Sequence, residues 1–245
     1  MAIPSRFAEA ATRTSIKGLT GWMINQKISF GSYKTSAINK GWTTGSSRIL
    51  NQVYSELLNI GMRQSTENTD GRYSFILNNG AKAAEIFCQT NLSSEQTDFI
   101  IKRKWATTIS NIEKVDYAFS ATIVPLTSTD QESWQLLVTK NYDASKDTTR
   151  KVKIFNIPVA IEEGVATNGK ESITIRPIRI NKITKKNGKE SKLPFKIRSG
   201  YELRMDDGVV CIINTYDNEL WMYNDLDENT TFILASIASA LMLTP

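Results

Sequence analysis

The stretch that decides the fold is NDLDENTTFILASIASALML, residues 224–243. Asn229 and Thr230 can cap a helix that runs through TFILASIASALML, and the acids just before them stand where the positive end of its dipole favours carboxylates. Apolar residues cover every side of this helix and leave no polar stripe. They are Phe232, Ile233, Leu234, Ile237, Ala238, Leu241 and Met242. The helix must therefore be buried all round, and at roughly 20 Å it is too short to cross a bilayer but matches the depth of a β-barrel.

Upstream of this helix the chain consists of strand-length runs rich in β-branched and aromatic residues. The segment GRYSFILNNGAKAAEIFCQT, residues 71–90, is the clearest hairpin, because Asn79-Gly80 supplies the positive φ angles of a tight turn. Further turn pairs are Gly31-Ser32, Asn187-Gly188, Asp207-Gly208 and Asp217-Asn218. Roughly a dozen short strands at such spacings are typical of meandering sheets. The sequence therefore predicts a mainly β fold, an antiparallel β-barrel or sandwich with a buried apolar C-terminal helix.

Two segments depart from the strand pattern. Residues 47–62, SRILNQVYSELLNIGM, have apolar positions near a helical spacing, which predicts an interior helix, with a pair of strands as the alternative. Residues 1–20 carry alanines among charges and are expected to form a tether or a short helix. The rest, residues 21–245, is expected to be a single β-rich domain that ends in a helix over residues 230–243.

The absence of histidine excludes several classes of enzyme. Ser-His-Asp and Cys-His nucleophile systems, HExxH metalloproteases and the iron site with two histidines and one carboxylate are impossible without it. The two cysteines, Cys88 and Cys211, each lie in an apolar run, which predicts buried free thiols and no zinc site. No glycine-rich phosphate loop or dinucleotide fingerprint is present, so we expect neither a cofactor nor a metal.

The sharpest charge feature lies in residues 170–199, which hold ten cations and two acids. Such a local excess favours a surface that contacts an anionic lipid headgroup or another polyanion. The candidate ligand-binding residues are Arg176, Arg179, Lys182, Lys185, Lys186, Lys196 and Arg198.

The same charges have a structural alternative. Residues 200–230 hold eight acids and one arginine, and strands that follow each other in sequence usually pair in space. Opposite charges would then face each other across one sheet and neutralise the surface. Nucleic acid is a disfavoured partner, because the whole chain has only 30 basic against 25 acidic residues and Phe195 is the only aromatic residue in the basic stretch.

A many-stranded β chain whose last element is an apolar helix preceded by acids resembles the tubby-like folds, which include LURP-one-related proteins and phospholipid scramblases. The residues that carry this resemblance are residues 224–243 and turn-linked strands such as RMDDGVVCIIN, residues 204–214. In that family a closed barrel wraps a hydrophobic C-terminal helix, and some members bind lipids or phosphoinositides. The resemblance implies the same architecture here, although the expected helix over residues 47–62 departs from it.

These observations favour a non-enzymatic binding or structural module of unknown ligand. The alternatives are a carboxylate-dependent hydrolase and, last, a nucleic-acid-binding protein. The adjacent pairs Glu162-Glu163 and Asp206-Asp207 supply no cooperating carboxylates, because neighbouring residues on a strand point to opposite faces. No apolar window approaches the length of a membrane span, so we expect a soluble chain. Its Asn-, Thr- and Lys-rich surface favours an extracytoplasmic protein with its leader removed over a cytoplasmic one, and its oligomeric state stays open.

Overall fold

The computed structural model describes residues 3–20, 26–55, 60–102, 106–126, 132–145, 161–184, 190–206 and 208–244. Within these ranges the chain forms thirteen strands and two helices. In chain order they are α1 (Ser5–Glu9), β1 (Ala11–Ser15), β2 (Ser29–Phe30), β3 (Tyr33–Thr35), β4 (Asn39–Ser55), β5 (Ile60–Asn78), β6 (Ala83–Lys102), β7 (Ala106–Pro125), β8 (Trp134–Asp143), β9 (Ile161–Thr167), β10 (Ser172–Thr184), β11 (Glu190–Met205), β12 (Gly208–Asn214), β13 (Glu219–Tyr223) and α2 (Glu228–Met242).

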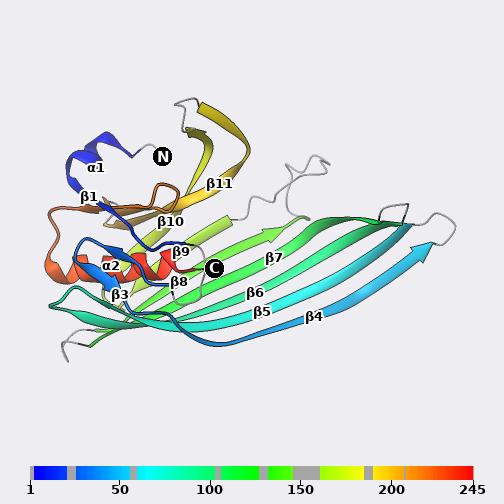
Figure 1. The fold of residues 1–245 in the computed structure, drawn as a ribbon, viewed down its shortest axis with the longest axis horizontal. Coiled ribbons are helices and arrows are strands. Elements are labelled where there is room, and N and C mark those ends of the chain that lie inside the picture. The colour runs from blue at the N-terminus through cyan, green and yellow to red at the C-terminus, as the bar shows by residue number, and fades with distance from the viewer. Residues whose placement is uncertain are drawn as a thin grey trace.

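The strands form one antiparallel sheet that curls into a nearly closed barrel (Figure 1). The strand order is β1-β13-β12-β11-β10-β9-β8-β7-β6-β5-β3-β2, and β4 pairs with β5 beside this path. At the two ends of the path, Lys17 and Ser29 exchange backbone hydrogen bonds of 2.8 and 3.0 Å, which join the residues after β1 to β2. Most neighbours in the sheet are also neighbours in sequence, so short turns can connect them. The predicted fold class is confirmed.

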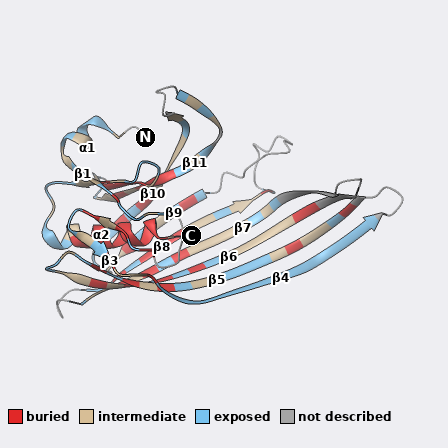
Figure 2. Cartoon of the chain, viewed as in Figure 1, coloured by how far each residue is buried: buried red, intermediate tan, exposed pale blue. Residues whose placement is uncertain are grey.

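Helix α2 occupies the middle of this barrel, and its residues from Phe232 to Met242 are all buried (Figures 1 and 2). All seven apolar side chains that the sequence placed around this helix are buried, and Leu234 and Ile237 among them are 0% exposed. Two serines interrupt the apolar surface, but Ser236 and Ser239 donate their hydroxyls to carbonyls four residues earlier, at 2.9 and 2.8 Å. The prediction that the sheet shields this helix around its circumference is confirmed. Neither helix in the described ranges has the length and apolar character needed to cross a bilayer.

The N-terminus of α2 is capped by Asp227, two residues before the first residue that the sequence suggested as a cap. One carboxylate oxygen of Asp227 accepts hydrogen bonds from the backbone N–H of Asn229 and Thr230, at 2.8 and 3.0 Å. The hydroxyl and backbone N–H of Thr230 lower the pKa of Asp227. The cap therefore remains ionised at the positive end of the helix dipole.

Alternation along the strands builds the wall that faces α2. In β8, for example, Trp134, Leu136 and Val138 are buried, whereas Leu137 between them is 45% exposed. This period of two is the expected one for a strand with one face on the core. The core comprises inward-facing residues of this kind from the strands of the barrel, together with apolar residues from all sides of α2.

The interior helix expected over residues 47–62 is wrong, because the described part of this segment is strand. Residues up to Ser55 belong to β4 and those from Ile60 belong to β5, and the two strands pair antiparallel. Val53 lies opposite Met62 in this ladder. The strand pair that the sequence left as an alternative is the observed structure. Together with β6 and β7 these strands extend well past the barrel (Figure 1).

Several predicted turns are present where the residues are described. Gly80 has φ +93°, and the Asn79 side-chain oxygen accepts from the backbone N–H of Ala81 and Lys82 at 3.1 and 2.7 Å, closing the hairpin of β5 and β6. Gly31, with φ +56°, turns β2 into β3. In the predicted turn at residues 217–218, between β12 and β13, Asn218 adopts φ +55°. Residues 187, 188 and 207 lie outside the described residues.

The cysteines and the N-terminal residues are the remaining features of the fold. Both cysteines are buried free thiols, as predicted. The N-terminal residues form the short helix α1, and the following strand β1 pairs with β13 from Ala11 opposite Tyr223 to Ser15 opposite Glu219.

Candidate functional site

The predicted basic residues lie on strands β10 and β11, which leave the barrel together. Strand β9 pairs with β10 only over residues 172–175, and β12 pairs with β11 only over residues 200–205. Pro177 has no backbone N–H to donate, which is consistent with the end of the β9 ladder just before it. Beyond these points, residues 179–184 and 190–198 pair only with each other within the described ranges. We call this two-stranded ribbon the basic hairpin.

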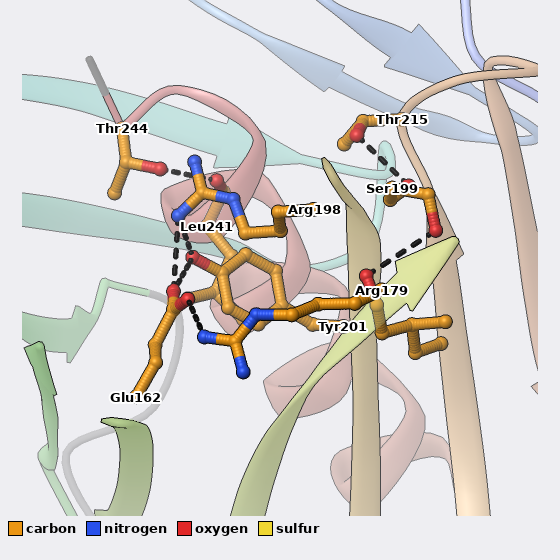
Figure 3. A network of polar contacts seen from close by, with 9 residues as sticks. Glu162, Arg179, Arg198, Ser199, Tyr201, Thr215, Leu241 and Thr244 are labelled. Carbon is orange, nitrogen blue, oxygen red and sulfur yellow. Dashed lines mark hydrogen bonds and ion pairs between the residues drawn. The ribbon is translucent and has the colours of Figure 1, made fainter. Parts of the chain in front are cut away.

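At the base of the basic hairpin, two arginines converge on one buried carboxylate (Figure 3). Arg198 Nη1 lies 3.0 Å from Glu162 Oε1, and Arg179 Nη2 lies 3.5 Å from Glu162 Oε2. The hydroxyl of Tyr201 donates to the same Oε1 at 3.0 Å. The Glu162 side chain is only 4% exposed, so it depends on these three donors to replace water.

The backbone explains why the arginines meet. In the β10–β11 register, Ile178 lies opposite Gly200 and Arg179 lies opposite Arg198, so Ser199 is an extra residue in β11. Regular alternation would place Arg198 on the face opposite Tyr201, three residues away, and the extra residue brings both to the same face. The Arg198 guanidinium then lies 5.1 Å from the centre of the Tyr201 ring, a favourable cation–π distance.

The cluster places two cations next to one acid. Arg179 and Arg198 are like charges in directly opposite positions, an arrangement that is unfavourable unless an anion lies between them. Glu162 supplies one negative charge for the two positive ones. Burial raises the pKa of Tyr201, so its phenol stays protonated and remains a donor. At the base of the basic hairpin, the described contacts therefore bring two guanidinium groups to one carboxylate.

A second tyrosine adds an unused polar group to this region. The Tyr117 hydroxyl is buried and has no hydrogen-bond partner among the residues that the structure describes. Burial raises the pKa of Tyr117 to about 12, and the charges of Arg198 and Glu162 also act on it. Sequence reasoning singled out neither this tyrosine nor the inward position of Glu162.

The remaining predicted ligand-binding residues occupy several environments. Arg176 is exposed and lies opposite Glu202 in the ladder. Lys182 is also exposed and lies opposite Lys192. The Nζ atom of Lys182 lies 3.2 Å from the carboxylate of Glu190. Lys196 is exposed on the basic hairpin. Lys185 and Lys186 lie outside the described residues.

The described part of the patch is partly neutralised by Glu162, beside Arg179 and Arg198, and by Glu190, beside Lys182. Neither acid belongs to residues 200–230, the segment that the structural alternative named. Glu202 of that segment lies opposite Arg176 in the ladder, and its side chain forms an ion pair with Arg204. The expected divergence of Glu162 and Glu163 is confirmed, because the first is buried and the second is exposed. This pair therefore offers no two carboxylates on one face.

A groove of about 460 Å³ opens elsewhere, where β4 begins beside β5, β6 and β7. Its described lining includes the ionisable residues Arg72, Tyr73 and Cys88. Burial raises the pKa of the Cys88 thiol to about 12, so the thiol is neutral at physiological pH and is not an activated nucleophile. The described residues also contain no cluster of three or more Cys, Asp or Glu side chains placed to hold a metal ion.

The balance between Glu162 and its arginines yields a stability prediction. We expect Glu162→Ala to lower the free energy of unfolding by about 1–3 kcal/mol, because it leaves buried donors without an acceptor. The loss should be smaller than for a fully buried ion pair, since the Arg198 side chain is 37% exposed and water can reach it. Urea unfolding of Glu162→Ala and of the exposed neighbour variant Glu163→Ala measures this. Equal midpoints for the two variants would contradict the structural role of Glu162.

Comparison with known proteins gives no match. No protein-family model, no curated protein and no solved structure matches this chain.

Proposed function

We propose that this protein is a non-enzymatic binding module that recognises multiply charged anions, such as phosphorylated lipid headgroups, through the basic hairpin. The observation that carries the proposal is the cross-strand pairing of like charges. Lys182 lies opposite Lys192, and Arg179 lies opposite Arg198, within one short ribbon. In the free protein Glu162 lies between the two arginines and Glu190 lies beside Lys182, so each group of cations has only one acid next to it in these contacts. A further anion that bridges the cross-strand cations would lower the repulsion that remains.

The position of the basic hairpin supports the same proposal. Its strands have no other strand partners in the described residues, so lysines at positions 182, 192 and 196 are exposed to solvent. A projecting cationic ribbon can approach a flat anionic surface more closely than cations set in the barrel wall can. Each lysine near an anionic surface contributes about 1 kcal/mol to binding.

The resemblance to tubby-like proteins belongs to this proposal as well. A barrel-like sheet around an apolar C-terminal helix supports it, and lipid binding by members of that family agrees with a phosphate-recognising hairpin. The fold alone does not define a ligand, because one architecture can carry many functions. The experiment that tests the proposal therefore targets the basic hairpin and not the architecture.

The test is binding to three anionic probes at low and at high salt: vesicles containing phosphatidylserine, a sulfated glycan and a single-stranded oligonucleotide. Vesicles of phosphatidylcholine alone are the uncharged control. We expect binding to the phosphatidylserine vesicles that weakens as salt screens the charges. Binding to the glycan alone would mean that the ligand is a soluble polyanion and not a lipid surface. Binding to none of the probes at low salt would refute the proposal.

Matched variants locate the contact. Lys182→Gln with Lys196→Gln removes two cations from the basic hairpin, and Lys27→Gln with Lys34→Gln removes two exposed cations from the opposite end of the chain. At about 1 kcal/mol for each lysine, the first double variant should bind more than tenfold more weakly than the wild type. The second should bind nearly as well as the wild type. Equal losses in both would mean that binding follows net charge and not the basic hairpin.

A further inference from the structure

Strands β4 to β7 continue beyond the barrel as a four-stranded sheet with two open edges. We call this sheet the arm; past the last pair of β7 with β8, at Lys114, its four strands comprise residues 49–55, 60–65, 96–102 and 106–113 (Figure 1). On one side, β4 pairs with β5 and with no other strand in the described residues. On the other side, β8 pairs with β7 only from Lys114 to Ile123. Residues 106–112 of β7 thus form the second open edge in the described part of the molecule.

Both edges lack most of the features that usually protect an open strand. Natural edges are short, carry lysines, prolines or inward charges, or contain bulges, all of which hinder pairing with another chain. The β4 edge, residues 43–53, reads TTGSSRILNQV and contains a single charge, Arg48. The β7 edge, residues 106–112, reads ATTISNI and contains no charge at all. One irregularity in the ladder, between Ile49 and Asn51, is the only interruption of β4 beyond residue 43.

Exposed apolar side chains lie on both edge strands. On β4, Ile49, Leu50 and Val53 are 55%, 49% and 57% exposed. On β7, Ile112 is 39% exposed. Apolar residues that face each other across paired strands stabilise a sheet, whereas these residues face water in the single chain. Pairing of the two edges would place neighbouring side chains beside them and reduce their exposure.

The directions of the two edges are complementary. Strand β4 runs away from the barrel, β5 returns, β6 runs away and β7 returns, because each pair is antiparallel. The β4 edge of one copy and the β7 edge of another can therefore pair antiparallel, in the manner of every other pair in the sheet. Each added copy contributes four strands and again presents one open edge of each kind, so the contact is head-to-tail and repeats.

We infer that the protein assembles with further copies of itself through the arm, by head-to-tail pairing of the β4 edge with the β7 edge of the next copy. The assembly is a ring if the rotation between copies closes and a filament if it does not. A two-fold dimer through β4 alone would leave both β7 edges open, whereas head-to-tail pairing leaves none open in a ring and only the two terminal edges open in a filament. This inference is independent of the anion site proposed above.

The test blocks each edge separately. Ile49→Lys with Val53→Lys places two charges on the β4 edge, and Ile112→Lys places one on the β7 edge. Ile161→Lys, at a residue of β9 that is 71% exposed, is the control for adding a lysine to an exposed apolar position. The measurement is molar mass by light scattering and sedimentation, together with circular dichroism to compare the folds.

We expect the wild type and Ile161→Lys to form assemblies of more than two copies and each edge variant to be a monomer. An equimolar mixture of the two edge variants should form a dimer and nothing larger, because each variant retains the edge that the other lacks. A monomeric wild type up to its solubility limit would overturn the inference. So would an Ile112→Lys variant that still associates as the wild type does, since this would indicate pairing through β4 alone.

Hydrogen exchange gives a second readout that leaves β4 unchanged. Amides of residues 43–53 should exchange slowly in the wild-type assembly and several-fold faster in the Ile112→Lys variant, because the partner strand is then absent. Equal exchange in the two proteins would overturn the inference even if an edge variant lost solubility.

Discussion

Leu234→Ala is expected to lower the free energy of unfolding by about 2–5 kcal/mol, the range for truncating a large buried aliphatic side chain. Leu234 is 0% exposed in the middle of α2, with sheet around the helix. The loss combines the transfer energy of the removed carbons with the cavity that the surrounding wall cannot fill. A cavity here is hard to collapse, since strands joined by continuous hydrogen bonds surround the helix. Urea unfolding followed by far-ultraviolet circular dichroism measures the change.

The control for Leu234→Ala is Glu228→Ala, six residues earlier in the same helix. The Glu228 side chain is 94% exposed, and its contact with Lys82 at 3.8 Å is a surface ion pair. Its removal should change stability by no more than about 0.5 kcal/mol. If the two variants unfold at the same urea concentration, α2 does not contribute to the core in the way that its burial indicates.

The central helix could be predicted from the sequence because its surface chemistry allows only one environment. A helix with Phe232, Ile233 and Leu234 on different sides has no face for water, and it is too short for a bilayer. The remaining strands then had to provide the surrounding wall. The turn at Asn79-Gly80 could be predicted as well, since few residues tolerate the positive φ that a tight hairpin requires.

The arm could not be predicted, because the apolar spacing in residues 47–62 fits a helix as well as a strand. Only partners far away in the sequence decide between them: Met62, for example, lies between Val53 of β4 and Phe99 of β6 in the ladder. Such long-range pairing overrides local spacing. The prediction of an interior helix failed for this reason, and the two open edges of the arm remained hidden with it.

Only part of the candidate site could be predicted from the sequence. The sequence pointed to Arg179 and Arg198 through the local excess of cations, but it gave no reason to bring them to one carboxylate. Two features of the backbone do so: Glu162 points inward from β9, and the extra residue Ser199 turns Arg198 to the same side as Tyr201. A glycine within a strand often marks such a bulge, and Gly200 next to Ser199 is the signal that could have found it.

Gly200→Ala should be one of the most disruptive single-methyl changes in the described chain. A Cβ atom at this position would lie 1.7 Å from the carbonyl oxygen of Ile213 and 2.8 Å from its carbonyl carbon. These are backbone atoms of β12, the strand that pairs with β11, so they cannot rotate away as a side chain would. The ladder between Gly200 and Asn214 must open to admit the methyl group. We expect a loss of about 3 kcal/mol in the free energy of unfolding, at the upper end for overpacking.

The same change should also disturb the candidate site, because Gly200 lies between Ser199 and Tyr201 at the point where the basic hairpin leaves the barrel. The Ser199 carbonyl accepts from the backbone N–H and the hydroxyl of Thr215 at 2.9 and 3.0 Å, and these bonds hold the bulge against the end of β12. Opening of this ladder would move the Tyr201 hydroxyl relative to Glu162. Gly200→Ala should therefore weaken anion binding even at temperatures where the barrel remains folded.

Gly208→Ala is the matched control, at the other end of the same two strands. Its Cβ would meet no atom closer than the Met205 carbonyl oxygen at 3.4 Å, an ordinary contact. There the added methyl group restricts the unfolded chain without a clash, so stability should be unchanged or should rise by up to about 1 kcal/mol. Thermal unfolding of both variants, followed by the vesicle-binding measurement, separates the two positions. Equal unfolding midpoints would mean that β11 and β12 do not approach each other at Gly200 as closely as the structure shows.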